Sequence, residues 1–173
     1  TRLQDFINEI GAPYHIHNDN AKMQTSEAWK KIQRTYNIDS STTEPHHPHQ
    51  NPAERKIKTI KNGIARLMDR TNTPGCLWFH CCVFWCMLLN VMALRKHDWR
   101  TPMEVAFGVT PDISAFLQFE WYEPVFYLDD DGASFPNSKE KLGRWIGIAE
   151  NCGDALTYKI WKPDTQETIC RSV

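Results

Sequence analysis

The sequence lacks the features that mark several classes of protein. Its first ten residues contain no continuous apolar run, so they do not form a secretory signal peptide. It has no internal repeats. Its net charge is only −1 and 12% of its residues are aromatic, which is not the composition of a disordered chain. With 173 residues, 41% of them hydrophobic, we expect one domain or one domain with a small module. Because the first residue is Thr1, we expect the N-terminus to be a cut end.

The cysteines are few and clustered, and they do not suggest a disulfide framework. Four of the six lie between residues 76 and 86, inside one apolar stretch. Such clustering is not typical of a small secreted domain, so a reduced, intracellular setting is expected. No His or Cys spacing matches the C-x₂-C or H-x₃₋₅-H pairs that mark a structural zinc site most strongly.

The charge is unevenly distributed along the chain. Residues 1–100 hold 14 Lys and Arg against 9 Asp and Glu, a net charge of +5. Residues 101–173 hold 6 against 12, a net charge of −6. This asymmetry indicates two modules with different partners, and the basic one is compatible with an anionic partner such as nucleic acid.

The first part of the sequence alternates helix and strand patterns. Helices are expected at 3–10, at 27–36 with Thr25 or Ser26 as the cap, and at 53–70. The last helix carries an apolar stripe made of Ile57, Ile60, Ile64, Leu67 and Met68. Short strands are expected at 14–17 and 38–43, and a loop rich in Pro and His spans 44–52.

The second part changes from helix to strand. Residues 76–94 are almost uncharged, and 101–107 read as a short helix with Thr101 as cap and Pro102 at its first position. Alternating segments at 122–128, 144–149, 155–161 and 167–173, separated by turn residues, indicate a small β-module. The sequence therefore predicts an α/β fold, with a first domain at 1–112 and a β-rich module at 113–173.

Two carboxylates occupy positions that suit a functional site. Asp19 follows a predicted strand and Glu54 begins a predicted helix, and such positions present functional groups to ligands in α/β folds. Two carboxylates brought together need a cation between them, and Mg²⁺ prefers oxygen ligands. The spacing of Asp19 and Glu54 alone is also compatible with ordinary surface residues. An Asp after a strand is common in α/β proteins, and a Glu four residues before a Lys is a common surface pair on a helix.

The predicted helix that holds Glu54 presents two lysines beside that carboxylate. At 100° per residue, Lys58 and Lys61 lie about 40° and 20° to either side of Glu54. This face is suited to hold a metal at the helix start and nucleic-acid phosphates along the next turns. Arg55, Lys56 and Arg66 broaden the basic surface.

Longer motifs around these residues match a known pattern. The segments His17-Asn-Asp-Asn20 and Thr42-Thr-Glu-Pro-His-His-Pro-His-Gln-Asn-Pro-Ala-Glu-Arg55 resemble the integrase core of copia-type LTR retrotransposons. Downstream motifs continue the likeness, among them Leu77-Trp78, Leu88-Leu89-Asn90, Thr101-Pro-Met-Glu104, Gly143-Arg-Trp-Ile-Gly147 and Tyr158-Lys-Ile-Trp161. The resemblance covers nearly the whole chain.

The resemblance implies a specific chemistry. It implies a partial RNase H-like integrase core, part of a Pol polyprotein, in which Asp19 and Glu54 are two of three catalytic carboxylates that bind Mg²⁺ or Mn²⁺. In the complete protein they would serve polynucleotidyl transfer, the integration of element cDNA ends into host DNA. The expected nucleic-acid contacts are Lys58, Lys61, Arg55, Asn51 and Gln50. The resemblance further implies a homo-oligomer and a nuclear location with a cytoplasmic particle stage.

The sequence also departs from the family. The first catalytic Asp and a zinc module belong upstream, Ala21 and Lys22 stand where glycines are usual, and Pro52 replaces a usual Gly. We therefore expect this chain alone to lack turnover.

Alternative interpretations remain open at this stage. One is a degenerate retroelement remnant that only binds nucleic acid, and another is a membrane protein held by residues 76–94, against which His80 and Asn90 argue.

Three other groups of residues have simpler interpretations. We expect the histidines of the Pro-rich loop to touch DNA rather than metal, and these are His46, His47 and His49. We expect the residues of the apolar stretch to be core residues, namely Cys81, Cys82, Cys86, Trp78 and Trp85, and Asp129–Asp131 to form an acidic turn.

Overall fold

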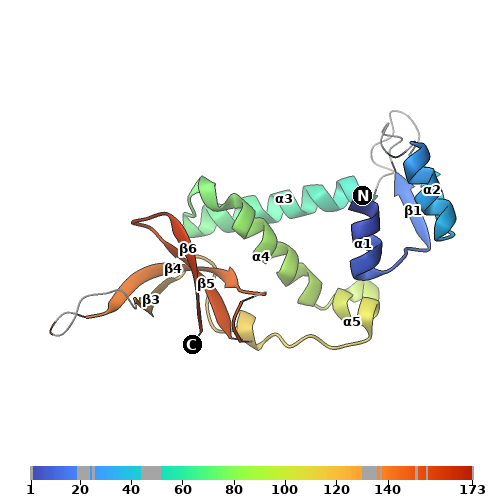
Figure 1. Ribbon diagram of the computed structural model, residues 1–173. Coiled ribbons are helices and arrows are strands. Elements are labelled where there is room, and N and C mark those ends of the chain that lie inside the picture. Colours follow the sequence, from blue (N-terminus) through green and yellow to red (C-terminus); the bar gives the residue numbers. More distant parts are fainter. Residues whose placement is uncertain are drawn as a thin grey trace. The chain divides into compact units, whose positions relative to one another are not determined.

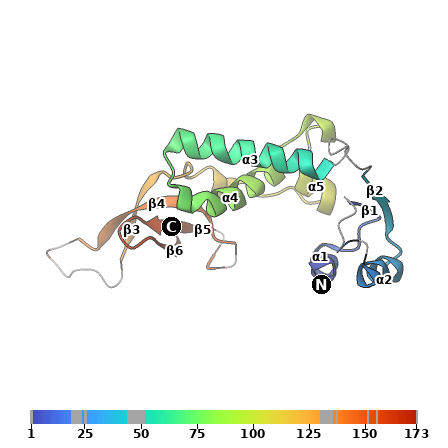
Figure 2. The same cartoon turned by 90° about the horizontal axis from the view of Figure 1, so that it is seen from above.

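The computed structural model describes residues 2–18, 24, 26–43, 52–129, 136, 138–150, 152–154 and 156–172. The chain divides into two compact units, Thr1–Thr59 and Ile60–Val173, and the division falls within helix α3 (Pro52–Thr71). Figures 1 and 2 show the elements of both units from two directions. The described residues form a mixed α/β structure, as the sequence predicts.

The first unit contains a strand–helix–strand crossover. Helix α1 (Arg2–Ile10) precedes β1 (His15–Asn18), α2 (Glu27–Thr35) and β2 (Asp39–Thr42). Strands β1 and β2 pair in parallel, with His15 opposite Asp39 and Asn18 opposite Thr42. Parallel strands need a crossover connection, and α2 supplies it. The predicted elements are therefore confirmed, with no end shifted by more than one residue.

A small apolar core holds this unit together. Leu3, Ile7, Ile32 and Ile38 are buried in it, and Ile16 and Trp29 pack against them. Phe6 and Ile10, which with Leu3 and Ile7 form one apolar stripe at helical spacing, are 46% and 54% exposed. The core of this unit therefore covers only part of the stripe of α1. The Ser26 hydroxyl caps α2 by accepting a hydrogen bond from the Trp29 backbone N–H at 3.3 Å, as expected for one of the two candidate caps.

The apolar stripe of helix α3 packs against a core only along the C-terminal half of the helix. Ile64, Leu67 and Met68 pack against the core of the second unit, and Gly63 is buried against the Trp85 ring of helix α4. The predicted stripe is wrong at Ile57, whose side chain is 51% exposed. Ile57 lies about 9 Å along the helix axis before Gly63, where α3 contacts the Trp85 ring of α4.

The long apolar stretch forms a 14-residue helix between two short turns. The 3-10 turn η2 (Gly75–Leu77) leads into α4 (Trp78–Val91), and η3 (Arg95–His97) follows. Within the ranges given above, no helix combines the length and apolarity needed to cross a membrane.

Helix α5 (Pro102–Phe107) begins with the predicted cap. The Thr101 hydroxyl accepts a hydrogen bond from the Glu104 backbone N–H at 3.1 Å, and the Thr101 backbone N–H donates to the Glu104 carboxylate at 2.9 Å. These two bonds form a capping box. The bond from the Thr101 backbone is the main cause of the lowered pKa of the Glu104 carboxyl. A further 3-10 turn, η4 (Ser114–Phe116), follows before the sheet.

The predicted β-module is a four-stranded antiparallel sheet. Its strands are β3 (Pro124–Leu128), β4 (Glu140–Ile148), β5 (Thr157–Lys162) and β6 (Glu167–Ser172), and they pair in chain order. Strand β4 begins four residues earlier than predicted, because Glu140–Gly143 pair with β3 although their pattern is largely polar. A bulge between Trp145 and Ile148 includes Gly147 at φ 122°, a backbone conformation that suits glycine.

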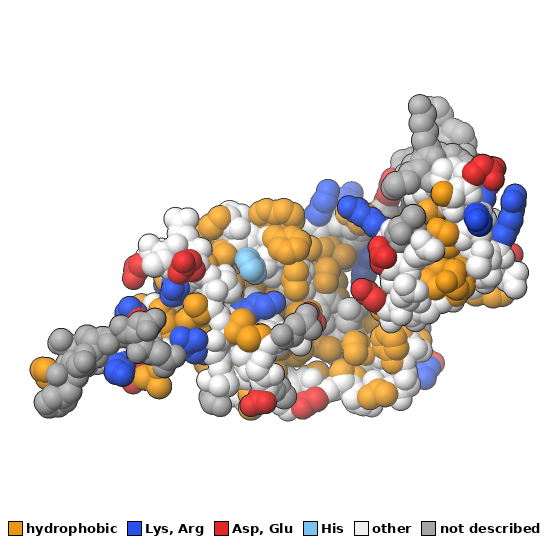
Figure 3. Space-filling view, viewed as in Figure 1, with side chains coloured by type: hydrophobic (Ala, Val, Ile, Leu, Met, Phe, Trp, Pro, Cys, Tyr) orange, Lys and Arg blue, Asp and Glu red, His pale blue; other side chains and the backbone are white. Residues whose placement is uncertain are grey.

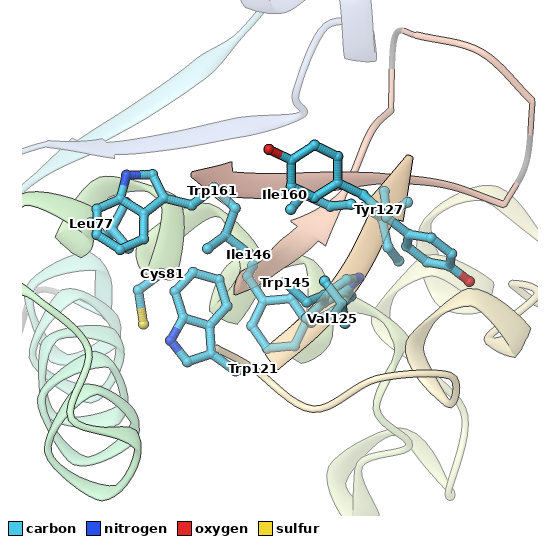
Figure 4. Packing of buried hydrophobic residues seen from close by; sticks show 12 residues of the cluster. Leu77, Cys81, Trp121, Val125, Tyr127, Trp145, Ile146, Ile160 and Trp161 are labelled. Carbon is cyan, nitrogen blue, oxygen red and sulfur yellow. The ribbon is translucent and has the colours of Figure 1, made fainter. Parts of the chain in front are cut away.

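One face of this sheet packs against α4 and builds the main core, shown in Figure 4. Trp145 and Cys81 are fully buried, and Phe84 stacks on Trp121 with ring centroids 5.2 Å apart. The expected core role is confirmed for Cys81 and wrong for Trp78, which is 58% exposed in the first turn of α4. Residues on both sides of position 112 share this core, and the domain boundary at 112/113 stays a prediction.

Candidate metal and nucleic-acid site

Strand β1 fixes the chain directly before Asp19. Asn18, its last residue, is only 7% exposed, pairs with Thr42, and accepts a hydrogen bond from the Thr43 backbone N–H at 2.8 Å. Asp19 itself lies outside the described residues, as do Gln50 and Asn51. The structure therefore places the strand that leads to Asp19.

Glu54 stands in the first turn of α3 with an exposed side chain. The N-terminal end of a helix favours a negative charge at this position. In the part of the chain that the structure describes, the salt bridges are Lys141–Asp129 and Lys162–Glu167. Glu54 thus forms no ion pair with Lys58, although the four-residue spacing permits one. The carboxylate is therefore accessible to a cation.

The basic face of α3 is exposed along its N-terminal half. Arg55, Lys58 and Lys61 all have exposed side chains. From Glu54 to Lys61 the helix rises about 10 Å, and the three side chains of Glu54, Lys58 and Lys61 fall within a sector of about 60°. Figure 3 shows Lys and Arg side chains gathered over this end of α3. The predicted arrangement of one carboxylate followed by two ammonium groups on one face is therefore present.

A network of imidazoles and hydroxyls lies on the β1–β2 pair and was not anticipated from the sequence. The Ser41 hydroxyl hydrogen-bonds both His15 Nε2 at 2.8 Å and His17 Nδ1 at 2.7 Å. His17 Nε2 also bonds the Thr43 hydroxyl at 2.9 Å. Residues two apart on a strand share a face, so the spacing of the two histidines signalled their common side. Their partners depend on the register with β2, which the sequence did not supply. The network fixes the strand that ends directly before Asp19.

The donor chemistry of the predicted pair fits a hard divalent cation. Glu54 offers an accessible carboxylate, and Mg²⁺ takes carboxylate oxygens together with phosphate oxygens and water. Among the residues with a described position, no three His, Cys, Asp or Glu side chains gather as a metal site. The second carboxylate of the set, Asp19, belongs to the segment that is not described.

Of the remaining residues singled out in the sequence, Asp129 and Cys81 have contacts that suit a structural role. Asp129, the first residue of the expected acidic turn, forms an ion pair with Lys141 across the β3–β4 hairpin. Burial, together with the nearby Cys82 thiol, raises the pKa of the Cys81 thiol to about 11, so this cysteine is unsuited to nucleophilic chemistry at neutral pH. The three histidines at 46, 47 and 49 lie outside the described residues.

Comparison with known proteins finds similarity among solved structures. No protein-family model and no curated protein matches the chain. A chain of the simian T-cell lymphotropic virus intasome in complex with PP2A regulatory subunit B56 gamma is similar at 19% identity and a TM-score of 0.48, over 97% of this chain and 58% of that one. The HTLV-2 integrase catalytic core domain in complex with magnesium, in a trimeric form, is similar at 23% identity and a TM-score of 0.44, over 60% of this chain and 64% of that one. The chain thus spans about three fifths of the length of these two proteins, and the two likenesses assign it neither a family nor a site residue.

Proposed function

We propose that this chain is part of a DNA integrase of the copia type, with an RNase H-like catalytic core. In the complete protein, Asp19 and Glu54 serve metal-dependent polynucleotidyl transfer. The observation that carries the proposal is the N-terminal face of α3, where Glu54 is exposed, free of ion pairs among the described residues, and followed on the same face by Lys58 and Lys61. The ordered motifs around residues 17–20 and 42–55 support the same assignment.

The proposed roles follow from the chemistry of each side chain. Asp19 and Glu54 would hold Mg²⁺ or Mn²⁺ with a third carboxylate from the upstream part of the protein. Such an ion, when bound, stabilises negative charge on the oxygens of a phosphodiester under attack. Lys58, Lys61 and Arg55 neutralise and position phosphates, and Gln50 and Asn51 contact the DNA from the preceding segment. Phosphoryl transfer depends mainly on such positioning and on electrostatic stabilisation.

The setting of this activity is part of the proposal. The DNA partners are the ends of the element cDNA and the host target, which places the working protein in the nucleus after a cytoplasmic particle stage. We also propose a homo-oligomer. The domain division at 112/113, with the four-stranded sheet as the C-terminal module, belongs to the same assignment.

The experiment uses the protein extended upstream to include its first carboxylate. Strand joining on labelled DNA is measured with Mn²⁺ for the unchanged protein, for Asp19→Asn and for Glu54→Gln. The matched control is Glu9→Gln, which removes an exposed carboxylate from α1. We expect joining to be lost in the first two variants and kept in the control.

Two other outcomes would contradict the proposal. If both variants join DNA as well as the unchanged protein does, the two carboxylates have no catalytic role. If the unchanged protein binds DNA without joining it in the presence of either metal ion, the protein is a remnant that only binds nucleic acid.

A further inference from the structure

A compact loop between α4 and α5 projects an aromatic side chain into solvent. The loop spans Leu94–Arg100, and we refer to it as the Trp99 loop. Its ends are joined by a bridge, in which the Leu94 backbone N–H donates to the Arg100 carbonyl at 3.1 Å. The Trp99 backbone N–H also donates to the Leu94 carbonyl at 3.1 Å. These bonds fix the backbone on both sides of the tryptophan. In Figure 1 the loop lies between the end of α4 and the start of α5.

Trp99 is held in an unusual backbone conformation. Its φ is 63°, and the preceding Asp98 also has a left-handed backbone, with φ 53°. Bulky residues rarely adopt this conformation, whereas glycine and asparagine adopt it readily. Trp99 is nevertheless 71% exposed, so this backbone conformation does not bury the side chain. Strained backbone that serves no packing is found at sites that hold ligands.

Three cationic residues belong to the same short loop as Trp99. Arg95, Lys96 and Arg100 all have exposed side chains, and Asp98 is the one acidic residue of the loop. Arg95 and Lys96 take no part in the salt bridges of the described chain. Arg100 is attracted by the carboxylate of Glu104 on α5. A loop that carries both an exposed aromatic ring and exposed cations has the two elements that proteins use to hold single-stranded nucleic acid. These elements are a surface on which bases stack and positive charge for the nucleic-acid backbone.

We propose that the Trp99 loop binds single-stranded nucleic acid by stacking an unpaired base on the Trp99 ring, while Arg95 and Lys96 contact the neighbouring phosphates. A base inside a duplex has both faces covered, so the site selects a single strand or an unpaired end over duplex. The inference deepens the proposed function and rests on it, because it adds a second contact to nucleic acid, remote in sequence from the α3 face.

The test measures binding of the whole chain to a fluorescein-labelled oligothymidylate and to a labelled duplex by anisotropy. The main variant is Trp99→Asn, because asparagine removes the ring and tolerates the left-handed backbone. Trp99→Phe keeps an aromatic ring. Trp78→Ala is the matched control, since Trp78 is also exposed, at 58%, and has no Lys or Arg beside it in the sequence.

We expect Trp99→Asn to weaken single-strand binding by about 5- to 150-fold, the range for loss of one stacked base, with an unchanged salt slope. Trp99→Phe should recover most of the affinity, and duplex binding should change little. Arg95→Ala with Lys96→Ala should instead lower the salt slope for single strands by about 1.4. Equal binding by Trp99→Asn and the unchanged chain, or an equal loss in Trp78→Ala, would overturn the inference.

The same assay separates this inference from the proposed function. If Lys58→Ala with Lys61→Ala weakens duplex binding while Trp99→Asn changes nothing, the loop has no role and the α3 face keeps its own. If Lys58→Ala with Lys61→Ala leaves duplex binding unchanged and Trp99→Asn weakens single-strand binding, the loop binds nucleic acid. In that case the α3 lysines do not contact DNA.

Discussion

Removing Lys58 and Lys61 together should change how DNA binding depends on salt. Each lysine that neutralises a phosphate releases condensed counterions from the DNA, which adds about 0.9 to the slope of log affinity against log salt. Both side chains are exposed on one face of α3, so both can reach phosphates of one duplex. Lys58→Ala with Lys61→Ala should therefore lower the slope by about 1.8.

The expected size of the effect follows from this slope. Between 50 and 200 mM salt, the unchanged chain should lose about 12-fold more affinity than the variant, since a fourfold change in salt is raised to the power of 1.8. The assay is anisotropy of a labelled duplex over a salt series. Alanine suits a helix, so circular dichroism should show an unchanged fold.

A matched control removes the same amount of charge from helix α2. Lys30→Ala with Lys31→Ala takes two exposed lysines from α2 and changes the net charge by the same amount. Its salt slope should equal that of the unchanged chain. If both double variants lower the slope equally, the effect reflects net charge, and the reasoning from the α3 face is refuted.

Three further predictions concern the fold of the second unit. Gly63→Ala should lower the free energy of unfolding in urea by about 1–3 kcal/mol, because a Cβ at Gly63 overlaps the Trp85 ring, and unchanged stability would refute the close contact. Cys81 should resist alkylation at pH 8 while the exposed Cys76 reacts, since a thiol with a pKa of about 11 is almost wholly protonated there; mass spectrometry of the peptides checks this. Thr101→Ala should cost about 1 kcal/mol by thermal melting, whereas Thr101→Ser should retain most of that stability through its own hydroxyl.

Local signals in the sequence were sufficient for most elements. Ser26 and Thr101 predicted the starts of α2 and α5, because a cap hydroxyl acts on backbone groups only a few residues away. The alternation of the last sixty residues likewise predicted the four strands, because a sheet with one buried face imposes a period of two.

Features that depend on distant partners were missed. Periodicity says which residues share a face, but it does not say how far the covering surface extends, and so the exposure of Ile57 and Trp78 was not foreseen. The bonds of His15 and His17 require the register of β1 against β2. The outward position of Trp99 depends on a left-handed backbone that its residue type disfavours.

The candidate site was predicted in part. The exposed face of α3 with Glu54, Lys58 and Lys61 is present as the helical spacing indicates. The pairing of Asp19 with Glu54 stays a prediction, since Asp19 lies outside the described residues. It rests on the motif around residues 17–20 and on the position of Asp19 directly after β1.

The most direct test of the central claim is to find where Mn²⁺ binds this chain. In NMR spectra of the chain, the paramagnetic ion broadens the backbone signals of residues close to it. We predict that small amounts of Mn²⁺ broaden the signals of Asn18 and Arg55 together, and that Asp19→Asn abolishes both effects at the same concentration. Broadening confined to the acidic segment at 129–131, or broadening near Asn18 and Arg55 that persists in Asp19→Asn, would contradict a shared metal site of Asp19 and Glu54.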